Sequence, residues 1–357
     1  MSDTRILFTP VNIGRTPLAN RIVMAPMTRS RSDDAGVPSD LVPVYYAQRA
    51  TAGLIISEGI FPVPAGKGYV RTPGLHSDAQ IAAWKKVTAA VHARGGRIFA
   101  QIMHAGRISD PSFQPGNATP VAPSAVRPKG ESYTDAGMKP YVTPRALETA
   151  EIPGIIAGYA QAARNAIAAG FDGVELHAAS GYLPMQFLSS GTNLRTDRYG
   201  GAAEHRIRFV VETLEAMAAA VGADRVGIKI SPEMAFNDIS DANRQETYTT
   251  LVRAIGGMGL AYLHVGLFGT PVDYHGLLKP LFKGTYIAGG GLTRESATEL
   301  VAAGRADAAA FGALFVANPD LPERFRRGAA LAAPDSGTFY TPGPKGYIDY
   351  PELGQAA

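Results

Sequence analysis

The sequence predicts an α/β fold, a single (β/α)8 TIM barrel. Eight short runs of β-branched and other apolar residues recur along the 357 residues, and patterns typical of amphipathic helices lie between most of them. Strands that alternate with helices build parallel βα units, and eight such units close into a barrel. A doubly wound sheet is the alternative, but no strand is followed by a G-x-G-x-x-G turn with a distant acidic residue. We therefore expect one barrel domain over residues 1–357.

The predicted strands are short and widely spaced. They are RIVMAPM (21–27), LIISEG (54–59), RIFAQIM (97–103), GVELHA (173–178), VGIKISP (226–232), AYLHVG (261–266), TYIAGGG (285–291) and AAAFGA (308–313). Helices are predicted between them from apolar residues at helical spacing, and several end at a glycine, as helix C-caps often do. These helices span residues 41–53, 78–95, 152–170, 203–222, 243–259 and 293–304.

Two segments depart from the regular alternation. Residues 108–150 follow the third strand and are rich in proline, serine, glycine and threonine. A loop of this length inside a compact domain usually serves as a lid or a binding element, so we expect a lid-like insertion there. The segment 334–357 carries three tyrosines among prolines and glycines, and we expect it to form an ordered C-terminal arm packed on the barrel.

The composition excludes several classes of function. The chain has no cysteine, which removes disulfides, thiolate nucleophiles, cysteine-ligated zinc and iron–sulfur clusters, and no metal site is expected. The net charge is only +3 and no lysine- and arginine-rich run occurs, so a nucleic-acid partner is not expected. The N-terminus lacks an apolar signal-peptide core, and no apolar run is long enough to span a bilayer. We expect a cytoplasmic protein without membrane contact, as a monomer or homodimer.

The carboxyl ends of barrel strands carry the chemistry in this fold. Here Thr28, Gln101 and Lys229 stand at the ends of three predicted strands, and the last two strands end in glycine. Backbone N–H groups at such glycines can approach a phosphate, while the polar side chains suit a flat heterocycle. FMN fits this description, with the cation near the pyrimidine edge of the flavin. Tight βα turns would also explain the glycines, and pairing with a nearby acid would also explain Lys229.

Several long runs, in order along essentially the whole chain, resemble the Old Yellow Enzyme family of FMN-dependent ene-reductases. They are RIVMAPMTRSRS (21–32), GLIISEG (53–59), residues 67–107, TPRALETAEIPGI (143–155), residues 170–201, AFGALFVANPDL (310–321) and GYIDYP (346–351). The resemblance implies a tightly but non-covalently bound FMN, with NADPH or NADH as the reductant. It implies small α,β-unsaturated substrates such as enones and maleimides, with nitro compounds as a further class.

The resemblance also implies roles for individual residues. Those implied in catalysis are Tyr182, as the proton donor, with His177 and Ser180 holding the activating oxygen of the substrate. Those implied to line the substrate pocket are Tyr69, Met103 and Tyr340, together with His177 and Ser180. Those implied to lie at the FMN site are Pro26, Met27, Thr28, Gly59, Gln101, Lys229, Gly289, Gly290, Gly312 and Ala313.

The stretch from His177 to Tyr182 also suits this reaction on physical grounds. Reduction of an activated alkene adds a hydride at Cβ and a proton at Cα, while negative charge builds on the carbonyl or nitro oxygen. Two hydrogen-bond donors aimed at that oxygen stabilise the charge where it develops, and a phenol can protonate Cα as a general acid. The segment that follows, NLRTDRYGG (193–201), is predicted to be structural, with Arg195 and Asp197 holding the loop in place.

Four positions depart from the family pattern, and all four fall at implied cofactor or substrate contacts. Ser180 replaces the usual histidine or asparagine, and Met103 replaces a frequent tryptophan, which would enlarge the pocket. Lys229 replaces an arginine and keeps the charge without the planar fork. Ala313 replaces an arginine that clamps the phosphate, so FMN would depend on backbone N–H groups, with Arg294 as a candidate helper. These changes predict a bulkier substrate or weaker retention of FMN.

Two alternatives remain open from the sequence. The first is a flavin-binding barrel with weak or altered turnover, because the four departures meet at one site. The second is a flavin-free lyase or isomerase acting on phosphorylated sugars, which would need a Schiff-base lysine or paired carboxylates at the strand ends. Glu58 stands alone and Glu175 lies earlier within its strand, so the second alternative is poorly matched.

Overall fold

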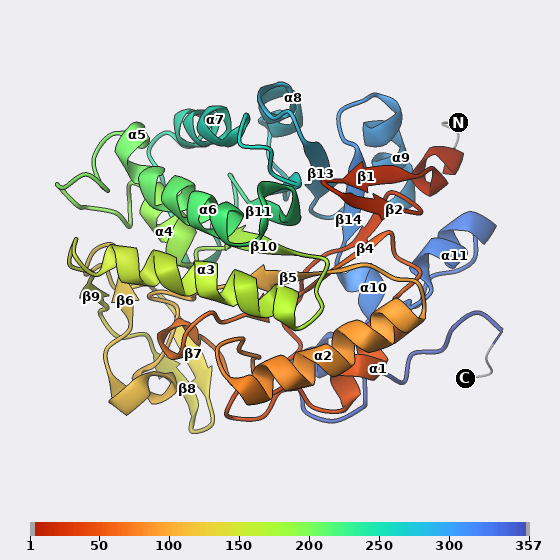
Figure 1. Cartoon of the computed structure of the whole chain (residues 1–357), viewed down its shortest axis with the longest axis horizontal. Coiled ribbons are helices and arrows are strands. Elements are labelled where there is room, and N and C mark those ends of the chain that lie inside the picture. The colour runs from red at the N-terminus through yellow and green to blue at the C-terminus, as the bar shows by residue number, and fades with distance from the viewer. Residues whose placement is uncertain (1–3, 355–357) are drawn as a thin grey trace.

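Eight parallel strands close into a barrel in the computed structural model, which describes residues 4–354 (Figure 1). In chain order the strands are β3 (Ile22–Met24), β4 (Leu54–Ile60), β5 (Ile98–Ile102), β10 (Gly173–Ala178), β11 (Val226–Ile230), β12 (Tyr262–Gly266), β13 (Thr285–Gly289) and β14 (Ala308–Phe311). Strands that are consecutive in this order pair with one another, and β14 pairs with β3 to close the ring. The predicted barrel and its eight strands are confirmed.

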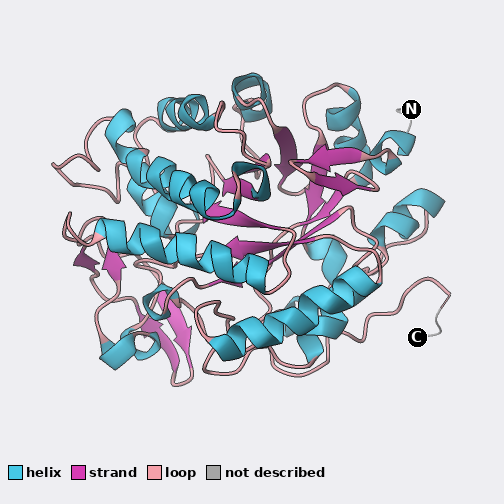
Figure 2. Cartoon of the chain, viewed as in Figure 1, coloured by secondary structure: helices cyan, strands magenta, loops and turns pink. Residues whose placement is uncertain are grey.

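Helices cover the outside of the barrel (Figure 2). The helices that follow the predicted alternation are α1 (Leu41–Gln48), α2 (Asp78–Ala93), α3 (Ile152–Ala168), α5 (Ala203–Arg206), α6 (Arg208–Val221), α7 (Arg244–Ile255) and α9 (Arg294–Ala302). The predicted helix over 203–222 is interrupted at Ile207, between α5 and α6. Short helices that the periodicity did not indicate are α4 (Leu183–Leu188), α8 (Tyr274–Leu278), α10 (Ala313–Ala317) and α11 (Leu321–Arg327). Within residues 4–354 no helix is long and apolar enough to cross a membrane.

A short hairpin closes the amino-terminal end of the barrel. It consists of β1 (Val11–Ile13) and β2 (Thr16–Leu18), which pair antiparallel. Its buried residues pack with inward side chains of the strands, and this cluster contains Ile13, Leu18, Val23, Leu54, Ile56, Phe99, Tyr262 and Ile287. Because this end of the barrel is filled by apolar side chains, the polar inward positions lie toward the carboxyl ends of the strands.

Residues 108–150 form small elements of their own beside the barrel mouth. β6 (Val121–Ala122) pairs with β9 (Arg145–Ala146), and β7 (Glu131–Thr134) pairs with β8 (Gly137–Pro140) as a hairpin. That this insertion closes over the barrel as a lid stays a prediction.

Arg195 fastens the loop after α4 to the insertion. Its guanidinium donates to the carbonyl oxygen of Pro123 at 3.0 Å and to the carboxylate of Asp197 at 3.0 Å. Asp197 in turn accepts a hydrogen bond from the backbone N–H of Tyr199 at 3.0 Å. The predicted structural role of Arg195 and Asp197 is confirmed.

The C-terminal segment packs against the first βα unit. Tyr347 is fully buried, and its ring stacks on that of Tyr45 with the centroids 4.1 Å apart. The buried guanidinium of Arg31 donates to the carbonyl oxygen of Phe339 at 2.7 Å. These contacts bring Phe339 and Tyr340 to the mouth of the barrel, where both line a cavity.

Candidate active site

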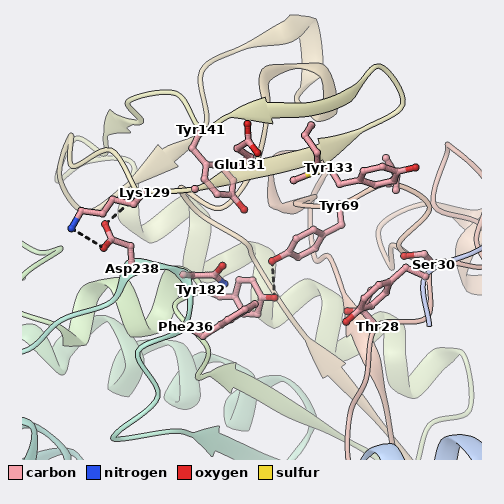
Figure 3. Close-up of a pocket in the computed structure, with 15 residues that line it drawn as sticks. Thr28, Ser30, Tyr69, Lys129, Glu131, Tyr133, Tyr141, Tyr182, Phe236 and Asp238 are labelled. Carbon is pink, nitrogen blue, oxygen red and sulfur yellow. Dashed lines mark hydrogen bonds and ion pairs between the residues drawn. The ribbon is translucent and has the colours of Figure 1, made fainter. Parts of the chain in front are cut away.

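Three cavities with shared walls open at the carboxyl ends of the barrel strands. The central cavity, of about 490 Å³, is lined by residues that include Gln101, His177, Tyr182 and Lys229. The glycine cavity, of about 510 Å³, lies beside Gly289–Gly291 and shares Lys229 with the central cavity. The outer cavity, of about 470 Å³, shares Tyr182 with the central cavity and opens toward the insertion (Figure 3).

Apart from Arg294, every residue that the sequence placed at the site lines one or more of these cavities. The central cavity is lined by Pro26, Met27, Thr28, Gly59, Gln101, Met103, His177, Ser180, Tyr182, Lys229, Ala313 and Tyr340. The glycine cavity adds Gly289, Gly290 and Gly312, and the outer cavity adds Tyr69. The barrel therefore gathers segments from residue 26 to residue 340 around one continuous opening.

A buried polar layer lies beneath the central cavity. Glu175 is fully buried in β10 and accepts hydrogen bonds from Gln101 Nε2 at 2.7 Å and from His264 Nδ1 at 3.0 Å. Because the carboxylate takes both N–H groups, the amide oxygen of Gln101 and Nε2 of His264 remain for other partners. Sequence reasoning missed Glu175 and His264. The available signal was position, since Glu175 lies two residues before His177 and therefore shares its face of the strand.

Lys229 places a cation in the wall between the central and glycine cavities. It stands opposite His177 on β10 and His264 on β12 in the strand register. Burial lowers the pKa of its ammonium group, and the nearby carboxylate of Glu175 raises it again in part. Among the described residues this ammonium makes no hydrogen bond, so its donors are available to a ligand in either cavity.

His177 is held as a neutral imidazole with a defined tautomer. Its Nδ1 accepts a hydrogen bond from the backbone N–H of Ala179 at 3.3 Å, so the ring proton is on Nε2. Burial lowers the pKa of His177 well below its usual value, and Lys229 and His264 lower it further. The side chain therefore presents an N–H donor and no net charge to the central cavity.

The turn after β10 orients the neighbouring groups. Ser180 has a left-handed φ of 56°, and its backbone N–H donates to Ser231 Oγ at 3.0 Å. Its carbonyl accepts from the side-chain amide of Asn237 at 2.8 Å, which ties the turn to the loop after β11. Tyr182 follows at the N-cap of α4, with its ring edge-on to His177 at a centroid distance of 4.9 Å. Burial raises the pKa of Tyr182 to about 12, so the phenol stays protonated at neutral pH.

The glycine cavity is built largely from backbone. Gly290 has a φ of 103°, and a Cβ atom there would lie 1.9 Å from the carbonyl oxygen of Leu267, so only glycine fits. Among the described residues that line this cavity, Lys229 is the only lysine or arginine. The Arg294 guanidinium points elsewhere, donating to the carbonyl oxygen of Phe325 at 3.2 Å. The expectation that Arg294 assists phosphate binding is therefore wrong.

Loop residues that no sequence pattern indicated complete the cavities. Phe236 and Phe268, from the loops after β11 and β12, line the central cavity, and Tyr141 from the insertion lines the outer one. None of them belongs to a periodic apolar pattern or to the end of a predicted barrel strand. Their approach to the site depends on loop paths that only the folded chain defines.

Comparisons with known proteins point to one family. The family model described as "NADH:flavin oxidoreductase / NADH oxidase family" matches residues 6–332. A 12-oxophytodienoate reductase 1 from Oryza sativa subsp. japonica is 45% identical, over 97% of this chain and 93% of the relative. A 12-oxophytodienoate reductase 2 from Arabidopsis thaliana is 40% identical, over 98% of this chain and 96% of the relative.

Solved structures lead to the same family. Morphinone reductase superimposes with a TM-score of 0.94 at 47% identity, over 97% of this chain and 96% of that chain. The old yellow enzyme homologue from Zymomonas mobilis gives a TM-score of 0.94 at 39% identity, over 97% of this chain and 99% of that chain. FMN as the cofactor removes the flavin-free alternative. This chain belongs to the NADH:flavin oxidoreductase / NADH oxidase family, that of the Old Yellow Enzymes, and is an oxidoreductase that uses FMN and a nicotinamide nucleotide.

Proposed function

We propose that this chain is an ene-reductase that reduces the C=C bond of enones, maleimides and related activated alkenes at the expense of NADPH or NADH. The observation that carries the proposal is the composition of the central cavity. One cavity brings together the neutral imidazole of His177, the protonated phenol of Tyr182 and the cation of Lys229. An activated alkene needs a donor at its oxygen, a proton for Cα and a hydride for Cβ.

The residues around the central and glycine cavities fit FMN. Lys229 would lie by the pyrimidine edge of the flavin with Gln101, whose amide is oriented by Glu175. Gly290 and Gly312 line the glycine cavity, and their backbone would receive the phosphate. When bound, FMN supplies the hydride that is added to Cβ.

His177 would hold the carbonyl or nitro oxygen of the substrate through Nε2–H. Ser180 lines the same cavity, and its hydroxyl would be the second donor. Both groups are held in place before substrate arrives. His177 stands in strand β10 and accepts a hydrogen bond from the backbone N–H of Ala179, and the turn that carries Ser180 is bound to Ser231 and Asn237. Donors preorganised in this way stabilise the developing negative charge, and the loss of one such donor typically slows a reaction by about 10²–10³.

The apolar surroundings of the outer cavity favour substrates that carry a large apolar body. Among the described residues, most of the exposed large hydrophobic side chains surround the openings of the three cavities, namely Tyr133, Met138, Phe236, Phe268 and Tyr340. Exposed apolar patches of this kind mark binding sites for apolar groups. We infer that the activated alkene occupies the central cavity while the rest of the substrate extends into the outer one.

The reaction is tested with Tyr182→Phe, because reduction and reoxidation of the flavin can be followed separately. The variant should be reduced by NADPH at nearly the wild-type rate and be reoxidised by 2-cyclohexenone much more slowly, by about 10²-fold or more. Equal loss in both half-reactions would refute the proton-donor role. If the wild-type protein itself is reduced by NADPH but no enone reoxidises it, the flavin-binding barrel with little turnover is the correct alternative.

The substrate class is tested with Met138→Ser on the rim of the outer cavity. The variant should raise KM for a bulky apolar enone several-fold and leave KM for 2-cyclohexenone unchanged, because only the bulky substrate reaches that wall. Leu331→Ser alters an exposed apolar residue that lines none of the three cavities and serves as the control. Equal effects of Met138→Ser on both substrates would contradict the assignment.

A further inference from the structure

The geometry points to Tyr69 as a positioning residue for the proton donor: its hydroxyl donates to Tyr182, directs the proton of Tyr182 toward the substrate and stabilises the phenolate that remains. This inference rests on the proposed role of Tyr182 as the general acid. It adds a second phenol that acts through the first and never itself contacts the reacting carbon.

The two hydroxyl groups meet directly. Tyr69 Oη lies 2.9 Å from Tyr182 Oη, and the two rings stand edge-on at 84° with centroids 6.2 Å apart. Figure 3 shows the phenols converging from opposite sides, Tyr69 from the loop after β4 and Tyr182 from the start of α4. Tyr182 lines both the central and the outer cavity, whereas Tyr69 lines the outer cavity alone.

The direction of the hydrogen bond follows from this arrangement. A phenol has one proton to donate, together with lone pairs that accept. If Tyr182 donated to Tyr69, its proton would point away from the central cavity and could not reach a substrate there. If Tyr69 donates, Tyr182 uses a lone pair and keeps its own proton for the central cavity.

The electrostatics of the pair agree with Tyr69 as the donor. Burial raises the pKa of both phenols, but the hydrogen bond between them lowers that of Tyr182 and raises that of Tyr69. Tyr182 is therefore the phenol that loses its proton more easily. The side chain of Asn237, which is itself held by the carbonyl of Ser180, lowers the pKa of both phenols, so it does not change this order.

In the proton-transfer step, Tyr182 gives up its proton, and Tyr69 donates a hydrogen bond without losing its own proton. As a hydride adds to Cβ, the π electrons of the alkene form the Cα–H bond with the proton of Tyr182. The O–H bond of Tyr182 breaks and its electron pair stays on the phenolate oxygen. That oxygen is buried, so a hydrogen bond from Tyr69 stabilises it more than the neutral phenol, because hydrogen bonds to charged groups are the stronger ones.

The loop that carries Tyr69 is held closely against the barrel. Within the loop, Thr72 Oγ1 donates to the carbonyl oxygen of Tyr69 at 3.0 Å, which stiffens the turn that carries the phenol. A Cβ atom on Gly68 would lie 2.4 Å from Cβ of Ala105, so the absence of a side chain lets this loop pack on the loop after β5. Tyr69 therefore meets Tyr182 in a fixed position, as a positioning residue must.

The first test is Tyr69→Phe in the FMN-loaded enzyme. Reoxidation of the reduced flavin by 2-cyclohexenone should slow by about 10- to 100-fold, while reduction by NADPH changes little. In the Tyr182→Phe background the same substitution should cause almost no further loss, because its effect passes through Tyr182. Tyr248→Phe removes the hydroxyl of a buried phenol outside the three cavities and is the control. Independent losses that multiply in the double variant would overturn the inference.

The second test does not depend on turnover. A fluorinated tyrosine at position 182 lowers the phenol pKa into an accessible range, and its fluorine resonance reports ionisation in the FMN-free protein. Tyr69→Phe should raise the midpoint by about one to two pH units, which corresponds to the expected 10- to 100-fold effect. An unchanged midpoint would overturn the inference. If Tyr182→Phe fails to slow reoxidation of the flavin, the proposed acid role of Tyr182 is wrong and the inference about Tyr69 is wrong with it. If Tyr182→Phe slows reoxidation as expected but Tyr69→Phe has no effect, only the role of Tyr69 is rejected.

Discussion

Replacement of Arg31 by alanine is expected to release the C-terminal arm from the barrel. The Arg31 guanidinium is buried and donates to the carbonyl oxygens of Thr338, Phe339 and Lys345 at 2.9, 2.7 and 3.1 Å. It also lies 4.7 Å from the centre of the Tyr347 ring. It also donates to the carbonyl oxygen of Gly343 at 3.4 Å, so one side chain holds four carbonyl groups and one aromatic ring of the arm.

The size of the effect follows from these contacts. A hydrogen bond to a charged group contributes about 1.5–3 kcal/mol, and losses at bonds that share one donor group are not additive. We expect Arg31→Ala to reduce the free energy that holds the arm by about 3–4 kcal/mol, which favours the released state by about 10²- to 10³-fold. Arg31→Lys should have a smaller effect, since it keeps the charge but not the fork of donors.

Hydrogen exchange measures this release directly. The backbone N–H groups of Tyr347 and Ile348 donate to the carbonyl of Pro344, both at 3.1 Å, and should exchange faster in Arg31→Ala by the factor given above. Arg327→Ala removes an exposed arginine paired with Glu323 and should leave these amides unchanged. KM should also rise, since the arm contributes walls to the central cavity. Unaltered exchange at both amides in Arg31→Ala would refute the reasoning.

Three further predictions concern the site itself. Within the described part of the chain, Lys229 is the only lysine or arginine that lines the glycine cavity, and Ala313→Arg adds a second such cation. This variant should bind FMN about 10-fold more tightly in a fluorescence titration of the apoprotein, whereas equal affinity would show that backbone groups suffice. His177→Ala should weaken binding of phenolate ligands about 10-fold or more. In the wild-type protein the pKa of His177 is lowered well below its usual value, so NMR should detect no ionisation of His177 between about pH 6 and 8. The same shift makes the native state bind fewer protons than the unfolded chain below about pH 6.5, so this residue reduces stability as the pH falls. Glu175→Gln leaves one acceptor oxygen for the N–H groups of Gln101 and His264. It should lower the free energy of unfolding by about 1–3 kcal/mol, as measured by denaturant titration. An unchanged unfolding midpoint would show that these two hydrogen bonds do not stabilise the fold.

The sequence by itself determined the barrel and the ring of polar residues at its mouth. Eight apolar runs alternating with helical patterns leave few topologies open, and parallel strands bring their carboxyl ends to one face. Lys229 and the glycines of the last two strands could therefore be placed together without coordinates. His177 and Tyr182 were assigned from the matching motif, because a lone histidine or tyrosine carries no such signal.

Only the tertiary structure decided which groups touch. The hydroxyls of Tyr69 and Tyr182 belong to residues 113 positions apart in the chain, and their contact depends on two loops packed on different strands. Glu175 became part of the site because barrel closure set Gln101 and His264 on either side of it, whereas Arg294 was turned away by its bond to Phe325. Periodicity reports which face a residue occupies on its own element. Distances between side chains on different elements depend on loop paths and packing, which no local pattern encodes.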